Sequence, residues 1–445
     1  MGEDMIVGIG GGRRGAALLL LFGTASGVVM TAAGTADAAG FYIQEQSVKG
    51  FGRANSGQVA DKGPASLWWN PAAIAGTRKA EASFGAIAIV PRGEVGDSGT
   101  LIDRPGVPPV PVGGPALRRN PIVSGVAPNS AFAIALGDRI AVGLAVTSPF
   151  SFTSEYDPTG RQRYSAIRSR LLTLDVQPSL AVAATDWLSV GAALNLEYTD
   201  AWLSNALPNL APNSPDGRLR LTGSGWDLGW SAGLQLRPSR RATVGIAYKS
   251  AVKHKLEGPV EISGLAGPLA SRNVKADTVA RFTTPWQLIV GARLGLGKGL
   301  TLNAQATRFG WSKFDRIEVA APVNNALEQN YKNTWALSVG IDQELGDRLT
   351  VRAGIQVDPT PTRDVSRIAR VPDGDRIDFT TGATFKISNR FAIDAAAGYV
   401  SIGDTPITRD EHFYVGTPAQ VDILTEGRGD KQRVFVLGLG GRLSL

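Results

Sequence analysis

The sequence predicts an all-β transmembrane protein, an outer-membrane β-barrel of about 14 antiparallel strands with a lumenal hatch containing short helices at its N-terminus. Three observations support this prediction. The chain keeps a two-residue hydrophobic period from residue 78 to its end, its connections alternate between short turns and long loops, and a leader precedes the first strand.

The first 38 residues have the pattern of a signal peptide. Arg13 and Arg14 precede an apolar run from Gly15 to Met30, and residues 36–38 supply the small-x-small pattern at which signal peptidase cleaves. The mature chain is therefore expected to begin at Ala39. Because the apolar run is long, a retained membrane anchor is the alternative interpretation.

Residues 39–77 are predicted to form the hatch. Asn70 is a favourable helix N-cap, Pro71 has the fixed φ that suits a first helical position, and Gly76 can adopt the left-handed conformation that closes a helix. These signals predict a short apolar helix from Pro71 to Ala75. Such a helix is too short to be stable alone, and two tryptophans directly ahead of it carry a large apolar area. Something large is expected to enclose this segment; a plain Asn-Pro turn before a strand is the alternative.

The barrel is predicted to occupy residues 78–445. In the segment 348–357 the apolar side chains share one face, namely Leu349, Val351, Ala353, Ile355 and Val357. The same alternation recurs at 300–307, 334–342, 391–399 and 434–445. A strand of about ten residues, tilted by about 40°, rises about 25 Å, which matches the apolar band of a membrane barrel. A secreted soluble sandwich also alternates, but its strands average about five or six residues.

The connections fall into two classes. Short turns are predicted at 137–138, 184–186, 238–239, 297–299, 346–347 and 388–389. Long loops are predicted at 91–128, 151–169, 200–217, 251–277, 313–330, 359–374 and 403–431. Six turns and seven loops that alternate give an even number of strands with both chain ends on the short-turn side, as an outer-membrane barrel requires.

Composition excludes several classes of function. The chain of 445 residues has no cysteine, so it has no thiolate metal site, and its two histidines, His254 and His412, lie far apart in sequence. A zinc enzyme or a catalytic triad is therefore not expected, and neither a cofactor nor a metal is predicted. The net charge of +7 fits arginine-bearing loops near anionic lipid headgroups, and it fits ordinary solubilising charge equally well.

Four segments, in chain order, share a pattern with one known family: AGFYIQEQSVKGFGRANSG (39–57), WNPAA (69–73), RFGWSKFD (308–315) and VPDGDRI (371–377). Over essentially its whole mature length the chain resembles the FadL/TodX outer-membrane transporters of long-chain fatty acids and other hydrophobic compounds. The resemblance implies a monomeric barrel in the outer membrane of a Gram-negative bacterium, blocked by the hatch. It also implies hydrophobic small molecules, membrane lipid and lipopolysaccharide as partners, and no nucleic acid.

The resemblance also assigns candidate site residues. The hatch motif would comprise Gly50, Gly52, Arg53, Asn70, Pro71 and Ala72, and the candidate ligand-pocket residues are Phe41 and Ile43. In the family, ligand leaves sideways next to an inward-kinked third strand. Here that strand would extend from Arg139 to Phe150, with Gly143 and Pro149 as the candidate residues that weaken its ladder.

The sequence departs from the family pattern at two positions. Ala73 replaces the glycine that usually follows Asn-Pro-Ala, which questions the backbone geometry of the hatch. The chain ends in Leu445 rather than in an aromatic residue, which questions how strongly the assembly machinery recognises the last strand.

The function predicted from these features is passive, lateral transport of hydrophobic molecules, either long-chain fatty acids or aromatic and aliphatic hydrocarbons. Loop arginines such as Arg161 and Arg163 are candidates for attracting a carboxylate or lipopolysaccharide phosphates, although solvated charge is their simpler role. A general porin for polar solutes is one alternative. An outer-membrane lipase or protease is another, but no histidine base can be placed with a nucleophile and an orienting partner.

Overall fold

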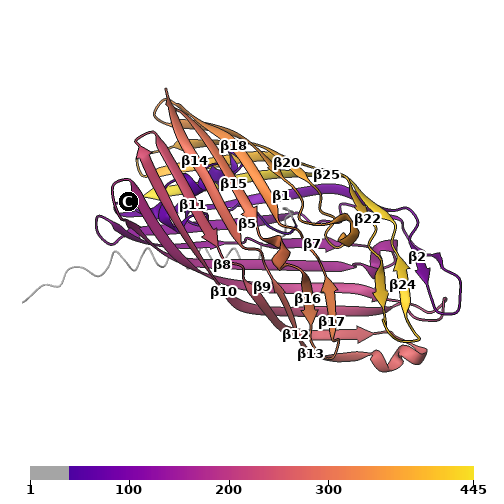
Figure 1. Cartoon of the computed structure of the whole chain (residues 1–445). Coiled ribbons are helices and arrows are strands. Elements are labelled where there is room, and N and C mark those ends of the chain that lie inside the picture. Colours follow the sequence, from indigo (N-terminus) through magenta and orange to yellow (C-terminus); the bar gives the residue numbers. More distant parts are fainter. Residues whose placement is uncertain (1–39) are drawn as a thin grey trace, which may run out of the picture. The chain divides into compact units, whose positions relative to one another are not determined.

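The computed structural model of the protein describes residues 40–445; the predicted signal peptide and Ala39 lie outside these residues. Fourteen strands form one closed antiparallel ring (Figure 1). They are β1 (Ala80–Asp97), β5 (Gly125–Ala135), β6 (Ile140–Thr147), β8 (Arg168–Ala183), β9 (Leu188–Leu207), β10 (Gly217–Ser239), β11 (Ala242–Lys249), β14 (Gln287–Gly297), β15 (Leu300–Phe309), β18 (Thr334–Leu345), β19 (Leu349–Asp358), β20 (Arg376–Lys386), β21 (Phe391–Ile402) and β25 (Gly427–Ser444). Each strand pairs with the next, and β25 pairs with β1. The predicted barrel and its strand number are confirmed.

Shorter elements extend the barrel at its long-loop end. The strands are β2 (Leu101–Asp103), β3 (Val110–Pro111), β4 (Leu117–Arg119), β7 (Ser151–Glu155), β12 (Lys253–Ser263), β13 (Val274–Thr283), β16 (Arg316–Val319), β17 (Asn325–Glu328), β22 (Thr405–Ile407), β23 (Glu411–Phe413) and β24 (Val421–Leu424). The 3-10 helices are η4 (Arg161–Tyr164), η5 (Gly267–Arg272), η6 (Trp311–Lys313) and η7 (Asp364–Ser366). Strands β23, β24, β2 and β3 form a separate small sheet.

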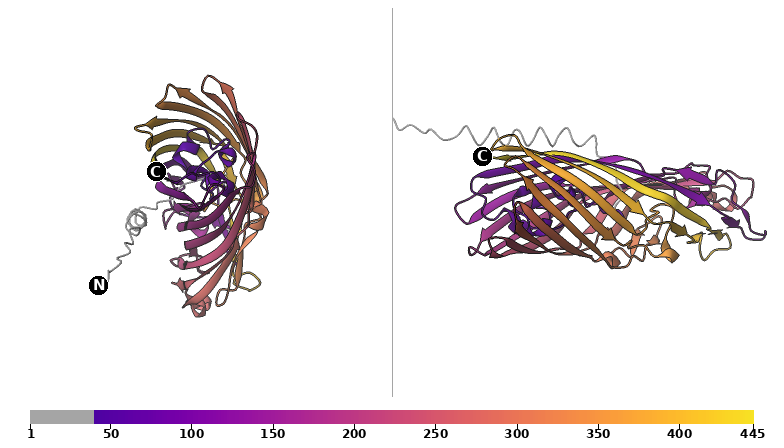
Figure 2. Two further views of the ribbon diagram at one scale, coloured as in Figure 1. Left: turned by 90° about the vertical axis from the view of Figure 1, so that its left-hand side faces the viewer. Right: turned by 90° about the horizontal axis from the view of Figure 1, so that it is seen from above.

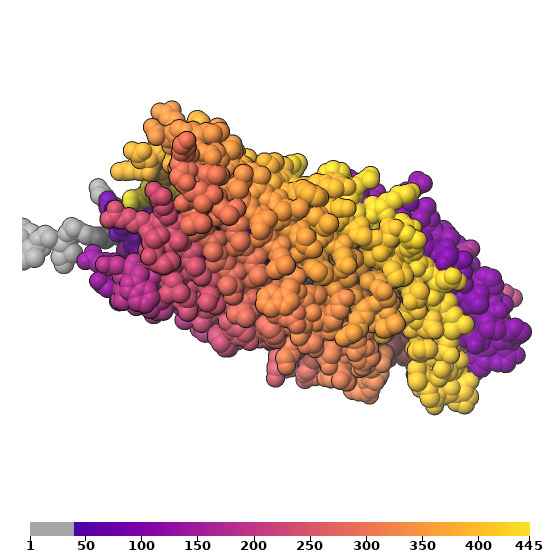
Figure 3. All heavy atoms as spheres, turned by 45° about the horizontal axis from the view of Figure 1, so that its top comes forward, coloured from indigo at the N-terminus to yellow at the C-terminus, as the bar shows by residue number. Residues whose placement is uncertain are grey.

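The alternating pattern places apolar side chains on the outside of the ring. On β18 the outward-facing residues Trp335, Leu337 and Val339 are 45%, 56% and 51% exposed, whereas the polar Ser338 and Asp342 on the other face are buried. A soluble barrel would reverse this arrangement, because its apolar face would fill the core. The exposed apolar wall is therefore suited to contact lipid. Figure 3 shows one side of the molecule, where segments distant in sequence lie next to one another on the surface.

The predicted turns lie at one end of the barrel, but strands extend into most of the predicted long loops; for example, β1 continues to Asp97, β8 begins at Arg168 and β25 begins at Gly427. In the segment 200–217, β9 continues to Leu207 and β10 begins at Gly217, and these strands reach 20 and 23 residues. The segment 251–277 contains β12 and the start of β13, which pair over ten positions. No helix in residues 40–445 is long and apolar enough to cross a membrane.

The hatch, defined here as residues 40–77, lies inside the ring near its short-turn end (Figure 2). It contains the α-helix α2 (Val48–Phe51) and the 3-10 helices η1 (Gln58–Ala60), η2 (Pro64–Ser66) and η3 (Pro71–Ile74). The predicted helix starting at Pro71 is therefore present, but it is a 3-10 turn that ends at Ile74 instead of Ala75. Gly76 has the predicted left-handed conformation, with φ of 84°.

Candidate functional site

A cavity of about 190 Å³ lies in the barrel above the hatch. Its lining is mainly aliphatic and aromatic, and it includes Phe41, Phe152, Leu171, Leu203, Leu221, Leu256, Val260, Phe282, Phe314, Val319 and Val371. These side chains come from the hatch, from β7 to β10, from β12, β13 and β16, and from the loops after η6 and β19. An enclosure of this composition binds apolar ligands, because burial releases about 25 cal/mol per Å² of apolar surface.

Charged side chains gather at one part of this cavity. Arg170, Arg370, Arg409 and Glu411 all belong to its lining. Arg370 is buried; its Nη1 donates to Ser169 Oγ at 2.6 Å and its Nη2 donates to the carbonyl oxygen of Ser165 at 2.7 Å. Burial lowers the pKa of Arg370 to about 10. The guanidinium is thus a fixed positive charge in the charged part of a mainly apolar lining.

Phe41 forms the floor of the cavity within a cluster of aromatic rings. Its ring centroid lies 4.9 Å from that of Phe314, 5.2 Å from that of Trp311 and 5.8 Å from that of Phe150. Tyr42, the next residue, also contacts Phe150, and it packs against Trp68 and Phe309 as well. Phe41 therefore borders an apolar cavity, and its role as a ligand-pocket residue stays a prediction. Ile43 does not line this cavity and belongs to a separate apolar cluster with β1, β21 and β25.

The third wall strand is interrupted at Pro149. Strand β6 ends at Thr147 and the chain resumes as β7 at Ser151. Between them the wall pairs with the hatch: Ile43 N donates to Pro149 O at 2.8 Å, and Ser151 N donates to Phe41 O at 3.0 Å. Proline has no N–H for the ladder, so its position at this break follows from its chemistry.

Gly143, the other candidate for weakening the third strand, does not interrupt it. It pairs regularly with Ala133 on β5 and with Ser179 on β8. A Cβ at this position would lie 2.7 Å from Ile74 Cδ1, so the glycine makes room for a hatch side chain. The expectation of a kink at Gly143 is corrected by this packing.

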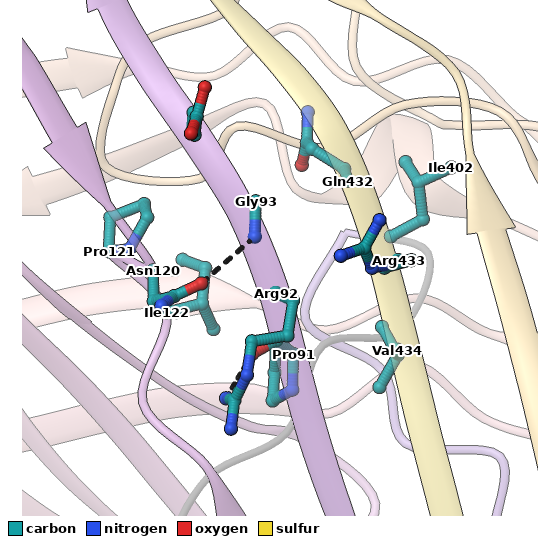
Figure 4. Close-up of a pocket in the computed structure, with 11 residues that line it drawn as sticks. Pro91, Arg92, Gly93, Asn120, Pro121, Ile122, Ile402, Gln432, Arg433 and Val434 are labelled. Carbon is teal, nitrogen blue, oxygen red and sulfur yellow. Dashed lines mark hydrogen bonds between the residues drawn. The ribbon is translucent and has the colours of Figure 1, made fainter.

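The break leaves a seam in the wall next to β5. The β5–β6 ladder ends at Ser130↔Val146, and pairing across the seam resumes only near Ile122↔Ser154. Figure 4 shows the wall just beyond the seam, where Asn120 Oδ1 accepts from Gly93 N at 3.2 Å. The small pocket there has a volume of about 10 Å³, so it holds no more than a water molecule.

Asn70 forms hydrogen bonds both within the hatch and between the hatch and the wall. Its Oδ1 accepts from Ala72 N at 2.9 Å as the predicted N-cap, and its Nδ2 donates to Val59 O at 2.7 Å and to Leu234 O at 3.0 Å. A Cβ at Gly233 would lie 2.1 Å from Asn70 Oδ1, so only glycine admits this approach. Pro71 and Ala72 also pack closely against Gly191, where a Cβ would lie 2.5 Å from the backbone of each.

The departure at Ala73 has a structural explanation. Ala73 is buried and is not among the described residues with positive φ, so an alanine fits this backbone without strain. Its carbonyl oxygen accepts from Gly63 N at 2.9 Å and thereby closes the loop that carries η2 and η3.

Arg53 anchors the first half of the hatch through a buried ion-pair network. It is fully buried, and its Nη2 lies 2.7 Å from Asp61 Oδ2 while its Nη1 lies 3.5 Å from Asp342 Oδ1 on β18. Burial alone would raise the pKa of Asp61, but Arg293, Lys49 and Arg53 together hold it well below its usual range.

Gly50 and Gly52 permit the close packing around this network. A Cβ at Gly50 would lie 2.6 Å from Gln58 Cδ, and one at Gly52 would lie 3.0 Å from the Cα of Gly382 on β20. Gly50 therefore permits close packing within the hatch, and Gly52 permits close packing between the hatch and the wall.

Lys249, which the sequence reasoning did not select, joins β11 to the hatch. Its Nζ donates to Trp68 O at 2.9 Å and lies 4.2 Å from the centroid of the Trp68 ring. The available signal was its position, because Gly245, Ala247 and Lys249 alternate on the lumenal face of β11. A buried lysine on that face, at the level of the hatch, requires a hydrogen-bond acceptor or an aromatic ring there, because burying an unpaired charge is costly.

The two loop arginines proposed from the sequence do not line the cavity. Arg161 pairs with Asp97 at 3.0 Å, and Arg163 pairs with Asp216 at 2.7 Å while lying over the ring of Tyr164. They join loops at the long-loop end. The arginines next to the cavity are instead Arg170, Arg370 and Arg409.

Comparisons with known proteins agree with this architecture. Residues 29–429 match the model of the family described as outer membrane protein transport protein (OMPP1/FadL/TodX). Outer membrane protein P1 of Haemophilus influenzae is 25% identical over 407 residues, covering 84% of this chain and 88% of that protein. The long-chain fatty acid transport protein of Escherichia coli K12 is 23% identical over 403 residues, covering 81% and 87%.

Solved structures have the same fold. The crystal structure of a Pseudomonas aeruginosa FadL homologue gives a TM-score of 0.78 with 24% sequence identity, covering 91% of this chain and 100% of that chain. The toluene transporter TbuX of Ralstonia pickettii gives a TM-score of 0.63 with 20% identity, covering 89% and 98%.

Proposed function

The chain belongs to the OMPP1/FadL/TodX family of outer membrane transport proteins, and on that basis we propose that it carries hydrophobic small molecules passively across the outer membrane. The observation that carries this proposal is the apolar cavity that ends on Phe41. Lipopolysaccharide hinders hydrophobic solutes, and an aqueous pore would not solvate them. An apolar cavity in the barrel supplies an environment in which such a solute is more stable than in water.

The preferred substrate is an amphiphile with one carboxylate, as in a long-chain fatty acid. The apolar lining would hold the alkyl chain, and the buried guanidinium of Arg370 would face the carboxylate in a charge-assisted hydrogen bond. A pure hydrocarbon would use the same lining without this contact. The buried guanidinium therefore favours the acid over the hydrocarbon.

Release is proposed to occur sideways through the seam next to β5. The floor residue Phe41 belongs to the same short segment that pairs with the interrupted third strand. A displacement of residues 41–43 would therefore open the floor and free the wall edge at Pro149–Ser151 together. A solute leaving there enters the bilayer without crossing an aqueous compartment.

Purified protein in lipid vesicles tests the proposal. Vesicles with the protein should take up labelled oleate faster than empty vesicles, and Ala280→Trp, which fills the cavity, should abolish most of the gain. Val290→Trp is the matched control, because Val290 faces outward at 37% exposure. If neither a fatty acid nor an aromatic hydrocarbon enters faster than in empty vesicles, the proposal is wrong.

The same vesicles distinguish the general-porin alternative. The hatch fills the lumen with buried side chains, so steady ion conductance should stay near that of protein-free bilayers. No catalytic step is part of the proposal. His254 lies between Thr199 and Thr284, each at 3.2 Å, and next to Glu197 and Asp227.

A further inference from the structure

The six short turns of the barrel carry an excess of positive charge. They comprise residues 136–139, 184–187, 240–241, 298–299, 346–348 and 387–390, which are together called the rim here. The rim has six basic residues, Arg139, Arg240, Arg241, Lys298, Arg348 and Arg390, and three acidic ones, Asp138, Asp186 and Asp347. Five of the six turns therefore contain at least one positive charge. Next to the rim, Arg78, Lys79 and Lys386 add to the excess and Glu344 reduces it.

The basic side chains of the rim are exposed and almost unpaired. Among residues 40–445, the one ion pair that they form joins Arg139 Nη2 to Asp186 Oδ1 at 3.9 Å. Loop arginines at the other end of the barrel differ, because Arg161 and Arg163 each pair with an aspartate of another segment, at 3.0 Å and 2.7 Å. The rim thus has positive charge that carboxylates of the described chain do not neutralise by contact.

Exposed apolar side chains lie among these charges. Leu136 is 61% exposed and Leu296 is 54% exposed, within three residues of Arg139 and Lys298 respectively. Trp187, which is 55% exposed, lies in the turn between β8 and β9. Tryptophan and leucine next to lysine and arginine are typical of the boundary between a membrane and water, where long basic side chains extend toward the headgroups. The rim therefore lies at the level of lipid headgroups.

The short-turn end of an outer-membrane barrel faces the periplasm, and the leaflet on that side consists of phospholipid instead of lipopolysaccharide. We propose that the rim binds the phosphate headgroups of anionic phospholipids in this leaflet, such as phosphatidylglycerol. A guanidinium group suits this ligand because it donates two parallel hydrogen bonds to phosphate oxygens. Arg240 and Arg241 supply two such groups in one turn. Headgroups bound around the rim fix the depth of the barrel in the bilayer.

Lipid retention by the mature protein tests the proposal independently of transport. The protein is placed in bilayer discs of equal parts phosphatidylglycerol and the zwitterionic phosphatidylethanolamine and is then extracted into mild detergent. Mass spectrometry quantifies the lipids that remain bound. At about 0.1 M salt phosphatidylglycerol should be in about threefold excess or more. At about 1 M salt the excess should largely disappear, because the screening length falls from about 10 Å to about 3 Å.

A fourfold variant locates the binding site on the barrel. Arg240→Gln/Arg241→Gln/Lys298→Gln/Arg348→Gln removes four of the six basic rim residues and should bring the two retained lipids close to equal amounts. The matched control replaces four basic residues at the long-loop end by glutamine, namely Arg218, Lys253, Lys275 and Arg281. These four are likewise exposed and form no ion pair among residues 40–445, so the control should keep the excess.

The salt series on the wild type keeps the proposal testable if the fourfold variant does not fold, which its migration in heated and unheated gel samples would reveal. A charge-conserving variant, Arg240→Lys/Arg241→Lys/Arg348→Lys, should retain most of the excess. Equal retention of the two lipids by the wild type would show that the rim is only solvated charge. An equal loss in the fourfold variant and its control, or an excess that persists at high salt, would also overturn the proposal.

Discussion

The ammonium group of Lys249 on β11 donates a hydrogen bond of 2.9 Å to the carbonyl oxygen of Trp68 in the hatch. Both residues are buried, and the same ammonium lies over the Trp68 ring. Lys249 therefore contacts both the backbone and the ring of Trp68, which lies two residues before Asn70. This contact, the Asn70 amide and the Arg53 ion pairs fix the hatch at separate points along its length.

Lys249→Met should loosen the second half of the hatch. The substitution keeps an unbranched chain but removes a charged donor, and such a hydrogen bond contributes about 1.5–3 kcal/mol. Faster proteolytic cleavage near Trp68 in the folded barrel checks this prediction. Lys255→Met is the control, because Lys255 is exposed and pairs with Glu257. Equal cleavage of the two variants would contradict it.

Arg370→Gln should weaken binding of a long-chain carboxylate by about tenfold or more, because a charge-assisted hydrogen bond is replaced by a neutral one. Binding of an uncharged hydrocarbon should change little. Titration of each ligand into the protein in detergent measures both affinities. Arg163→Gln removes an arginine of the same loop region that does not line the cavity. A similar loss for both ligands would show that Arg370 acts on the shape of the cavity.

Asn70→Ala should remove the cap of η3, at a cost of about 1 kcal/mol, and also the two bonds from its amide nitrogen to Val59 and Leu234. We expect altered transport with an intact barrel. Hydrogen exchange of the hatch amides, measured next to vesicle uptake, checks this. Asn129→Ala serves as the comparison on the wall. Unchanged exchange together with unchanged uptake would refute the role given to Asn70.

Asp61 should make hatch stability depend on pH in the acid range. Its pKa in the folded protein is depressed, so its contribution is fully present above the unfolded value of about 3.9 and is lost as pH falls through the folded value. Stability should therefore fall below about pH 4 in the wild type. Asp61→Asn should lower stability at pH 7 and flatten this dependence. Chemical denaturation followed by Trp68 and Trp69 fluorescence measures both, and a parallel pH profile for the variant would contradict the assignment.

The architecture could be predicted because each of its signals is local. Alternation along β18, glycine-containing turns and the Asn70-Pro71 cap each depend on residues close together in sequence, and all three were found as expected. The closed ring then follows from backbone hydrogen bonding in lipid. The predicted loops that contain strands, such as 251–277, were wrong for a physical reason. Beyond the bilayer the outer face is wetted, so the charges of Lys253 and Lys255 no longer distinguish a strand from a loop.

The site could be predicted only in part, because its residues meet through the closed ring. Phe41 was identified through the family resemblance, whereas Arg370 and Lys249 are separated from their partners by about 200 residues and by 181 residues. Nothing in the sequence around Arg370 distinguishes it from Arg363 or Arg367. The same holds for Gly143, whose neighbour Ile74 is known only from the fold.

The hydrogen bonds of residues 41 and 43 with the interrupted third strand have a mechanical consequence. At this point the hatch completes the barrel wall, because residues 41 and 43 supply hydrogen bonds to the interrupted third strand. The same hatch segment carries the ring of Phe41, which lines the cavity. Pulling that segment aside removes the floor and exposes unpaired backbone in the wall in one movement. In the proposed route, entry into the cavity and release through the wall would therefore both depend on residues 41–43.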